Sequence, residues 1–133
     1  MIGIVLISHG KMAEGMIDSA KLFFGDAIEQ LAYVTLKMED SPEDFQNLLA
    51  EAIKEVDGGE GVIVLADLLG GTPSNRAAYL VSDNVQVITG MNLTIFLELL
   101  GLRLSGAVDV HNLIATGQSG IVSLNDLLQE QVD

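Results

Sequence analysis

GIVLISHG, at residues 3–10, is the stretch of this chain that decides its fold. It is a short apolar run, rich in β-branched residues, that stops abruptly at Ser8, His9 and Gly10. A run of this length bounded by turn residues predicts a strand buried on both faces, as in a parallel sheet covered by helices. Three further runs of the same kind follow along the chain, at residues 31–36, 61–66 and 85–89.

Helical patterns lie between these runs. In the clearest one, Ser41 is a capping residue, Pro42 suits the first turn, and Asp44 holds the acidic position of a capping box. Apolar residues from Phe45 to Val56 then recur at helical spacing and form one stripe. Weaker patterns cover residues 12–24, 72–81, 95–102 and 105–116. The alternation of strands and helices predicts an α/β fold, a three-layer α/β/α domain with a mostly parallel sheet, and a single domain spanning residues 1–133. A short apolar segment, residues 120–123, predicts a last strand.

The composition narrows the possible partners. Six Lys and Arg residues against nineteen Asp and Glu residues give a formal net charge of −13. Nucleic acid and anionic lipid need basic residues, so neither is expected as a partner, whereas a basic protein surface is favoured. Solubility alone would also explain this charge. The chain has no cysteine, no signal peptide and no apolar run of membrane length, so we expect a cytoplasmic location.

Polar and glycine-rich residues follow three of the predicted strands. They are Ser8 to Gly10, Asp67 with the turn at residues 70–75 (GGTPSN), and residues 89–92 (TGMN). Because the carboxyl ends of parallel strands share one edge of a sheet, His9 and Asp67 are expected to meet there.

A histidine beside a carboxylate has a defined chemistry. The carboxylate binds one ring nitrogen, and the other is left free to act as a base, a metal ligand or a nucleophile. The turn before Thr72 presents backbone amides at a helix start, which suits an anion. Together these features point toward phosphoryl transfer. Each also has a plainer interpretation: a surface histidine, a turn-capping Asp67 and a tight connection.

Other chemistry finds less support in the sequence. His111 falls in a late helical segment and is interpreted as a solvated or packed helix residue. With two histidines, no cysteine and no His-x-x-x-His spacing, no metal site is expected. The phosphate-binding loop of nucleotide-driven kinases and the nucleophile elbow of acyl hydrolases are both absent from the sequence. No cofactor is expected.

The chain resembles the IIA component (EIIA) of the mannose-fructose-sorbose family of the bacterial phosphoenolpyruvate-dependent sugar phosphotransferase system. The resemblance covers nearly the whole chain and rests on residues 3–10, residues 13–15 (AEG), Asp67, residues 70–75 and residues 90–93 (GMNL). Two positions depart from the family pattern. Thr94 stands where a proline is expected, and Leu69 stands where an aromatic residue is common.

The resemblance implies roles for individual residues. His9 would be phosphorylated on Nε2, and Asp67 would orient the ring through the other nitrogen. Gly10, Gly71 and Thr72 would hold the phosphoryl oxygens. Residues behind these, expected to support the site, are Ser8, Ser74, Asn75 and Asn92.

The resemblance also implies partners. HPr would donate the phosphoryl group, a IIB component would accept it, and membrane IIC and IID components would be served indirectly. Family members are cytoplasmic and usually homodimeric, so residues 120–123 would form an edge strand that is antiparallel or exchanged between subunits.

Three alternatives stay open at this point. The first is the IIA-like subunit of a phosphoenolpyruvate-dependent dihydroxyacetone kinase, although Gly10 after His9 favours the sugar system. The second is a regulatory module in which phosphorylation of His9 switches the choice of partner. The third is a hydrolase that uses His9 and Asp67 on a water molecule.

Overall fold

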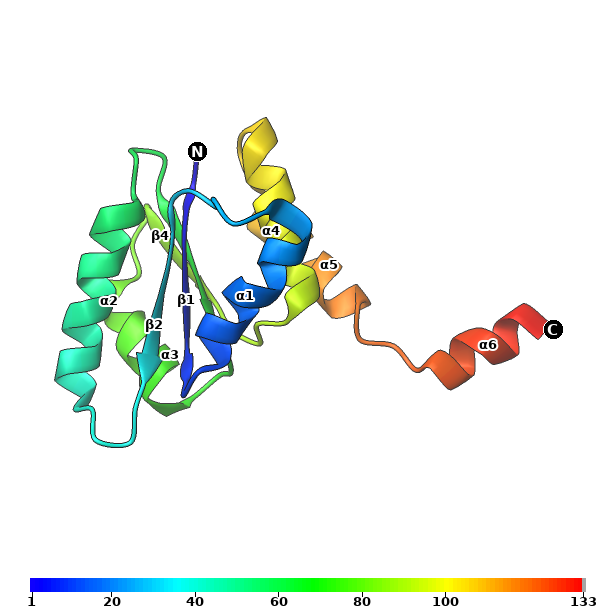
Figure 1. Cartoon of the computed structure of the whole chain (residues 1–133), viewed down its shortest axis with the longest axis horizontal. Coiled ribbons are helices and arrows are strands. Elements are labelled where there is room, and N and C mark those ends of the chain that lie inside the picture. The colour runs from blue at the N-terminus through cyan, green and yellow to red at the C-terminus, as the bar shows by residue number, and fades with distance from the viewer. Residues whose placement is uncertain (133) are drawn as a thin grey trace.

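Four parallel strands form the centre of the fold, in the order β2-β1-β3-β4 (Figure 1). The strands are β1 (Gly3–His9), β2 (Leu31–Leu36), β3 (Val62–Ala66) and β4 (Val85–Ile88). The structure is a computed structural model and describes residues 1–132. The predicted parallel sheet is confirmed, and β1 lies in its interior between β2 and β3. The opening segment of the chain therefore ends at the middle of the sheet's carboxyl edge.

Helices cover both faces of this sheet, which confirms the three-layer prediction. They are α1 (Met12–Phe24), α2 (Pro42–Val56), α3 (Gly71–Ala77), α4 (Leu93–Leu102), α5 (Val110–Ser119) and α6 (Leu124–Val132). Helices α1, α4 and α5 pack on one face, and α2 and α3 pack on the other. Two short 3₁₀ turns, η1 (Ala78–Leu80) and η2 (Arg103–Ser105), extend α3 and α4.

The core explains why residues 3–10 carry no polar alternation. Ile4 and Leu6 point into the layer of α1, α4 and α5, whereas Val5 and Ile7 point into the layer of α2 and α3. All four side chains are fully buried. The part of a strand that is covered by helices on both faces needs apolar residues at every position, and β1 has them from Ile4 to Ile7.

The predicted helix boundaries are confirmed closely at α2 and poorly at α5. Ser41 caps α2 as predicted, because its hydroxyl accepts a hydrogen bond from the Asp44 amide at 3.1 Å. The predicted helix from residue 105 begins instead at Val110. Gly106, at φ +125°, interrupts the chain, and Asp109 then caps the new helix through the amides of two following residues.

The predicted strand at residues 120–123 is wrong for the single chain. Gly120 ends α5, and the following residues run away from the body to α6 without pairing to a strand of the described chain (Figure 1). Ile121 is 76% exposed and Val122 is 57% exposed. A strand needs a neighbour with free backbone groups, and this segment turns away from the sheet instead. Its exchange between two subunits stays a prediction.

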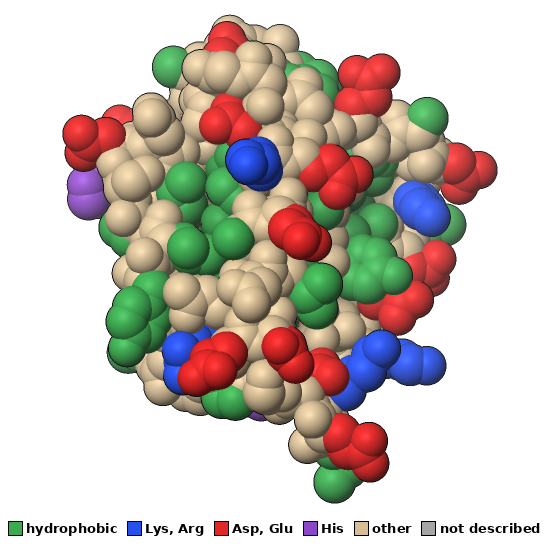
Figure 2. Space-filling view, turned by 90° about the vertical axis from the view of Figure 1, so that its left-hand side faces the viewer, with side chains coloured by type: hydrophobic (Ala, Val, Ile, Leu, Met, Phe, Trp, Pro, Cys, Tyr) green, Lys and Arg blue, Asp and Glu red, His purple; other side chains and the backbone are tan. Residues whose placement is uncertain are grey.

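Acidic side chains are spread over the face that α2 presents, and no basic patch gathers on the side that Figure 2 shows. Within residues 1–132, no helix is both long enough and apolar enough to cross a membrane.

Candidate functional site

The ends of β1 and β3 bring His9 and Asp67 into direct contact, as predicted. Asp67 Oδ2 lies 2.7 Å from His9 Nδ1 and also accepts the His9 backbone amide at 2.9 Å. The other oxygen, Oδ1, accepts the amide of Leu68 at 2.9 Å. The Asp67 side chain is only 7% exposed, whereas that of His9 is 45% exposed. A buried carboxylate with both oxygens bonded therefore holds a histidine that faces solvent.

This contact fixes which nitrogen of His9 is reactive. An ionised carboxylate only accepts hydrogen bonds, so Nδ1 must carry the proton that lies between it and Asp67. In the neutral ring, Nε2 then holds the free lone pair. Since Oδ2 also binds the main chain of His9, the ring and its backbone are held by one atom. The imidazole is thus oriented with Nε2 as a nucleophile or base.

Nε2 lies directly against the start of α3. A Cβ atom built on Gly71 would stand 2.8 Å from both Nε2 and Cε1 of His9, closer than side chains approach one another. Gly71 has φ +79° and Gly70 has φ +91°, a backbone that suits glycine. The glycine pair predicted as a turn therefore lets the main chain approach the reactive nitrogen.

Helix α3 differs in detail from the prediction. The helix predicted over residues 72–81 begins one residue earlier, at Gly71, and its α-helical part ends at Ala77, where the 3₁₀ turn η1 follows. Ser74 is buried, and its hydroxyl donates to the Gly70 carbonyl at 2.9 Å, which holds the glycine turn against the helix. Thr72 and Asn75 line an open groove along α3. Ser74 thus supports the turn, and Thr72 directly follows the glycine that touches His9.

Ser8 stabilises the turn after β1 through two hydrogen bonds. Its side chain is completely buried, donates to the Gly10 carbonyl at 3.0 Å and accepts the Ala13 amide at 2.8 Å. Gly10 itself has φ +57° and allows the sharp change of direction into α1. His9 is therefore fixed on both sides of its Cα atom.

Asn92 supports the layer next to the site, and its hydrogen bonds run to α4 and α5. Its Oδ1 accepts the Ile95 amide at 2.8 Å, which caps α4, and its Nδ2 donates to the Gly117 carbonyl at 3.0 Å. Thr94, which stands where a proline is expected, lies in the first turn of α4 and packs against Gly120. The cap provided by Asn92 orders this loop without a proline.

Exposed apolar side chains accompany the site. Leu68 and Leu69 directly follow Asp67 and are 47% and 84% exposed, and Met12 is 44% exposed. Exposed apolar residues around a reactive group mark a surface suited to another protein. His111 is exposed in the first turn of α5, and its backbone amide donates to the Asp109 carboxylate that caps this helix.

Together these features define a class of protein. It is a parallel α/β domain that presents one carboxylate-oriented imidazole nitrogen at an open surface, suited to reaction with a group carried by another macromolecule. The sequence profile described as "EIIA-man: PTS system fructose IIA component" matches residues 3–116. The chain belongs to this family, the mannose-type IIA components of the bacterial sugar phosphotransferase system, and its activity is phosphoryl transfer within that system.

Individual relatives agree with this assignment. The chain is 30% identical over 105 residues to the PTS system fructose-specific EIIA component of Bacillus subtilis, covering 77% of this chain and 71% of that one. It is 29% identical over 104 residues to the PTS system mannose-specific EIIAB component of Escherichia coli K12. This match covers 77% of the present chain but only 32% of that relative. The crystal structure of a PTS IIA protein associated with the fucose utilization operon of Streptococcus pneumoniae superposes with a TM-score of 0.86 at 27% identity, covering 95% of each chain.

Proposed function

We propose that His9 is a phosphohistidine carrier, which accepts a phosphoryl group on Nε2 from HPr and passes it to a IIB component. The observation that carries this proposal is the double contact of Asp67 Oδ2 with His9, through the ring Nδ1 and through the backbone amide. It leaves a single nitrogen reactive on a half-exposed ring. The family assignment supports the same interpretation.

The geometry supports a direct transfer between two imidazoles. The Nε2 lone pair attacks the phosphorus of the donor's phosphohistidine, so a new N–P bond forms as the donor's N–P bond breaks. The electrons of the broken bond return to the donor ring. Transfer to the acceptor repeats these steps with His9 as the leaving group. In both directions the Nδ1 proton stays between His9 and Asp67, whose negative charge stabilises the positive charge that develops on the phosphorylated ring.

The surroundings of Nε2 suit a phosphoryl group that must be transferred onward to an acceptor. The glycine turn at Gly70 and Gly71 brings main chain, rather than a side chain, against the nitrogen. Near the site motifs in the sequence there are two basic residues. Lys11 follows Gly10, and Arg76 follows the turn at residues 70–75 and donates through Nη1 to Gln46. We propose that Gly71 and Thr72 hold the phosphoryl oxygens by hydrogen bonds, without a direct ion pair that would slow release. Gly10 was also expected in this role, but its backbone amide donates to the Leu36 carbonyl at 2.8 Å, so Gly10 shapes the turn after β1 instead.

The molecular surface fits a role among other proteins. A net charge of −13 favours a donor with a basic docking face, and it would accelerate the encounter at low salt. We also propose a cytoplasmic location and a homodimer in which residues 120–123 pair with the partner's sheet. The position of β4 at the edge of the sheet and the exposed apolar residues of that segment support this arrangement.

Reconstituted transfer tests the proposal. The protein is incubated with phosphorylated HPr, and label is followed onto His9 and then onto a separate IIB protein. His9→Ala should abolish labelling, whereas the matched control His111→Ala should leave it unchanged, since His111 is exposed on α5. Labelling that persists in His9→Ala would contradict the proposal.

The same assay separates the alternatives. Label that passes only to a dihydroxyacetone kinase subunit would identify the related kinase pathway. Label that stays on the protein in the presence of a IIB component would favour a regulatory module. Turnover of small phosphate esters by the isolated protein would favour a hydrolase.

A further inference from the structure

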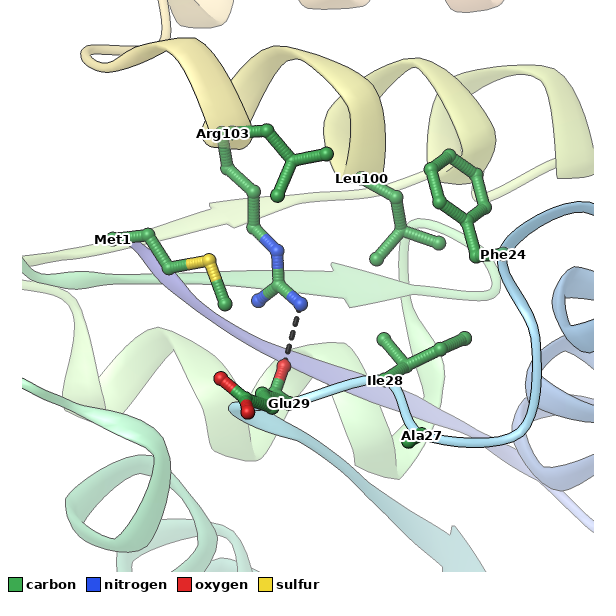
Figure 3. A pocket seen from close by; sticks show the side chains of 8 residues that line it. Met1, Phe24, Ala27, Ile28, Glu29, Leu100 and Arg103 are labelled. Atoms are coloured by element: carbon green, nitrogen blue, oxygen red, sulfur yellow. Dashed lines mark hydrogen bonds between the residues drawn. The ribbon is translucent and has the colours of Figure 1, made fainter.

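The two arginines of the chain differ in what they can bind. Arg103 is only 3% exposed and lies beside a cavity at the amino ends of β1 and β2 (Figure 3). Its guanidinium donates to the main-chain carbonyls of Ile2, Glu29 and Gln30. Arg103 therefore joins the amino ends of these two strands, and its role is structural. Arg76, on α3, is the arginine that stays partly exposed.

Arg76 lies in an open groove beside the candidate site. One side of the groove is a face of α3 and of its η1 extension, where the residues recur at intervals of three and four. The residues of this α3 face are Thr72, Asn75, Arg76 and Tyr79. Pro42, at the start of α2, lines the other side. Because Thr72 follows Gly71, whose main chain lies against Nε2 of His9, the groove begins beside the reactive nitrogen.

Arg76 is held by two neighbours and leans away from His9. Its Nη1 donates to Gln46 of α2 at 3.2 Å, and its Cζ atom lies 5.6 Å from the centre of the Tyr79 ring. Tyr79 follows Arg76 along the chain, whereas His9 contacts Gly71, the first residue of α3. Gly71 and Arg76 are five positions apart, which is about 7.5 Å at 1.5 Å per residue. The guanidinium is thus fixed in the part of the groove away from the phosphoryl site.

The charge of Arg76 is free to meet a partner. Within residues 1–132, no carboxylate lies within ion-pair distance of its guanidinium. Of its five N–H donors, one is bonded in that part of the chain, to Gln46. Such an arginine can bind a carboxylate through two parallel hydrogen bonds. Tyr79 beside it is 72% exposed, and arginine and tyrosine are among the residues that contribute most to protein interfaces.

We propose that the α3 face docks a carboxylate-bearing segment of the IIB acceptor, and that Arg76 binds this carboxylate. The inference rests on the proposed function and adds a difference between the two partners. A net charge of −13 favours a donor with a basic face. Such a face is repelled by Arg76 and offers it no carboxylate. Arg76 therefore favours docking of the acceptor over docking of the donor.

The test measures the two half-reactions separately, at 0.15 M salt. Label is followed from phosphorylated HPr to His9, and from phosphorylated His9 to a IIB protein, over a range of partner concentrations. Arg76→Glu should raise the KM for IIB by about tenfold or more at an unchanged kcat, and should not raise the KM for HPr. Arg76→Lys keeps the charge but loses the paired hydrogen bonds, so its KM for IIB should be intermediate.

Lys54→Glu is the matched control, because it changes the net charge by the same two units as Arg76→Glu. Lys54 is exposed in the last turn of α2, and Pro42 begins that helix. These residues are twelve positions apart, about 18 Å along the helix, which exceeds the screening length of about 8 Å at this salt concentration. Lys54→Glu should therefore leave the KM for IIB unchanged.

Three results would overturn the inference. They are an unchanged KM for IIB in Arg76→Glu, an equal rise of this KM in Lys54→Glu, and an equal rise of the KM for HPr in Arg76→Glu. Each leaves the proposed function standing, because the parent protein still passes label to IIB. A parent protein that accepts no label from HPr, or passes none to IIB, would overturn the proposed function and this inference together.

Discussion

Replacing Gly71 by alanine should block the reactive nitrogen of His9. The new Cβ atom would lie 2.8 Å from Nε2 and from Cε1, whereas ordinary contacts begin at about 3.4 Å. The ring cannot turn away freely, because Asp67 holds it at Nδ1. Either the ring or the α3 turn must move by several tenths of an ångström. A displacement approaching 1 Å at a reacting atom lowers transfer by about 100-fold.

Backbone strain adds a second effect that must be separated from the first. Gly71 has φ +79°, and a non-glycine residue in this region costs about 1–2 kcal/mol. Gly70→Ala supplies the matched control, because Gly70 has φ +91°, and within the described chain a Cβ atom at this position would meet nothing closer than 4 Å. Both variants should lose stability in urea unfolding, because each places a side chain at a positive φ. Only Gly71→Ala should lose most of its phosphoryl transfer.

The assay is the initial rate of label transfer from phosphorylated HPr, measured at a temperature where both variants are folded. The reacting phosphorus is expected beside Gly71, so Gly71→Ala should be much slower than Gly70→Ala. Equal rates for the two variants would refute this placement of the phosphoryl group.

Three further substitutions test other parts of the site and the fold. Asp67→Asn should keep the fold but slow transfer by about 10–100-fold, because an amide orients the ring without a charge; unchanged rates would remove Asp67 from its role. Ser8→Ala leaves the buried Ala13 amide without its acceptor and should lower the free energy of unfolding by about 1–3 kcal/mol in urea titrations, and a loss near zero would show that the turn is held by other contacts. Leu99→Ala opens a cavity in the fully buried layer under α4 and should lower that free energy by about 2–5 kcal/mol without changing the transfer rate per folded molecule; a large kinetic effect would mean that this layer also positions the site.

Much of the fold could be predicted because its signals are local or repeat along the chain. The β1 run is apolar at every position before its end, and this pattern indicates helices on both sides of the sheet. The start of α2 follows from Ser41 and Asp44, whose hydrogen bond is made within one turn. The meeting of His9 and Asp67 follows from parallel topology, since both residues lie at the ends of strands on the same edge.

Other features depend on contacts that no local pattern specifies. The segment at residues 120–123 is apolar enough for a strand, but pairing depends on where the chain after α5 travels. Because Asn92 follows β4, the sequence predicts that its side chain supports the site. In the structure, that side chain instead binds the backbone of Ile95 and Gly117. The one local signal for this role is that Asn92, a favoured capping residue, directly precedes α4 and can bind the amide three residues later.

The burial of Arg103 could not be predicted, for a similar reason. A single cation at the end of an apolar helix is typical of a solvated residue, and here it is buried by carbonyls from Ile2, Glu29 and Gln30. These acceptors lie more than seventy positions away in the sequence. The one local signal is the apolar character of residues 99–102, which precede Arg103 without another charge.

The most direct test of the central claim is the intact mass of the protein after incubation with phosphoenolpyruvate, enzyme I and HPr. We predict a gain of one phosphoryl group that requires HPr, is lost on acid treatment and is absent from His9→Ala. No gain, in a reaction where HPr itself is phosphorylated, would contradict the assignment of His9 as a phosphohistidine carrier.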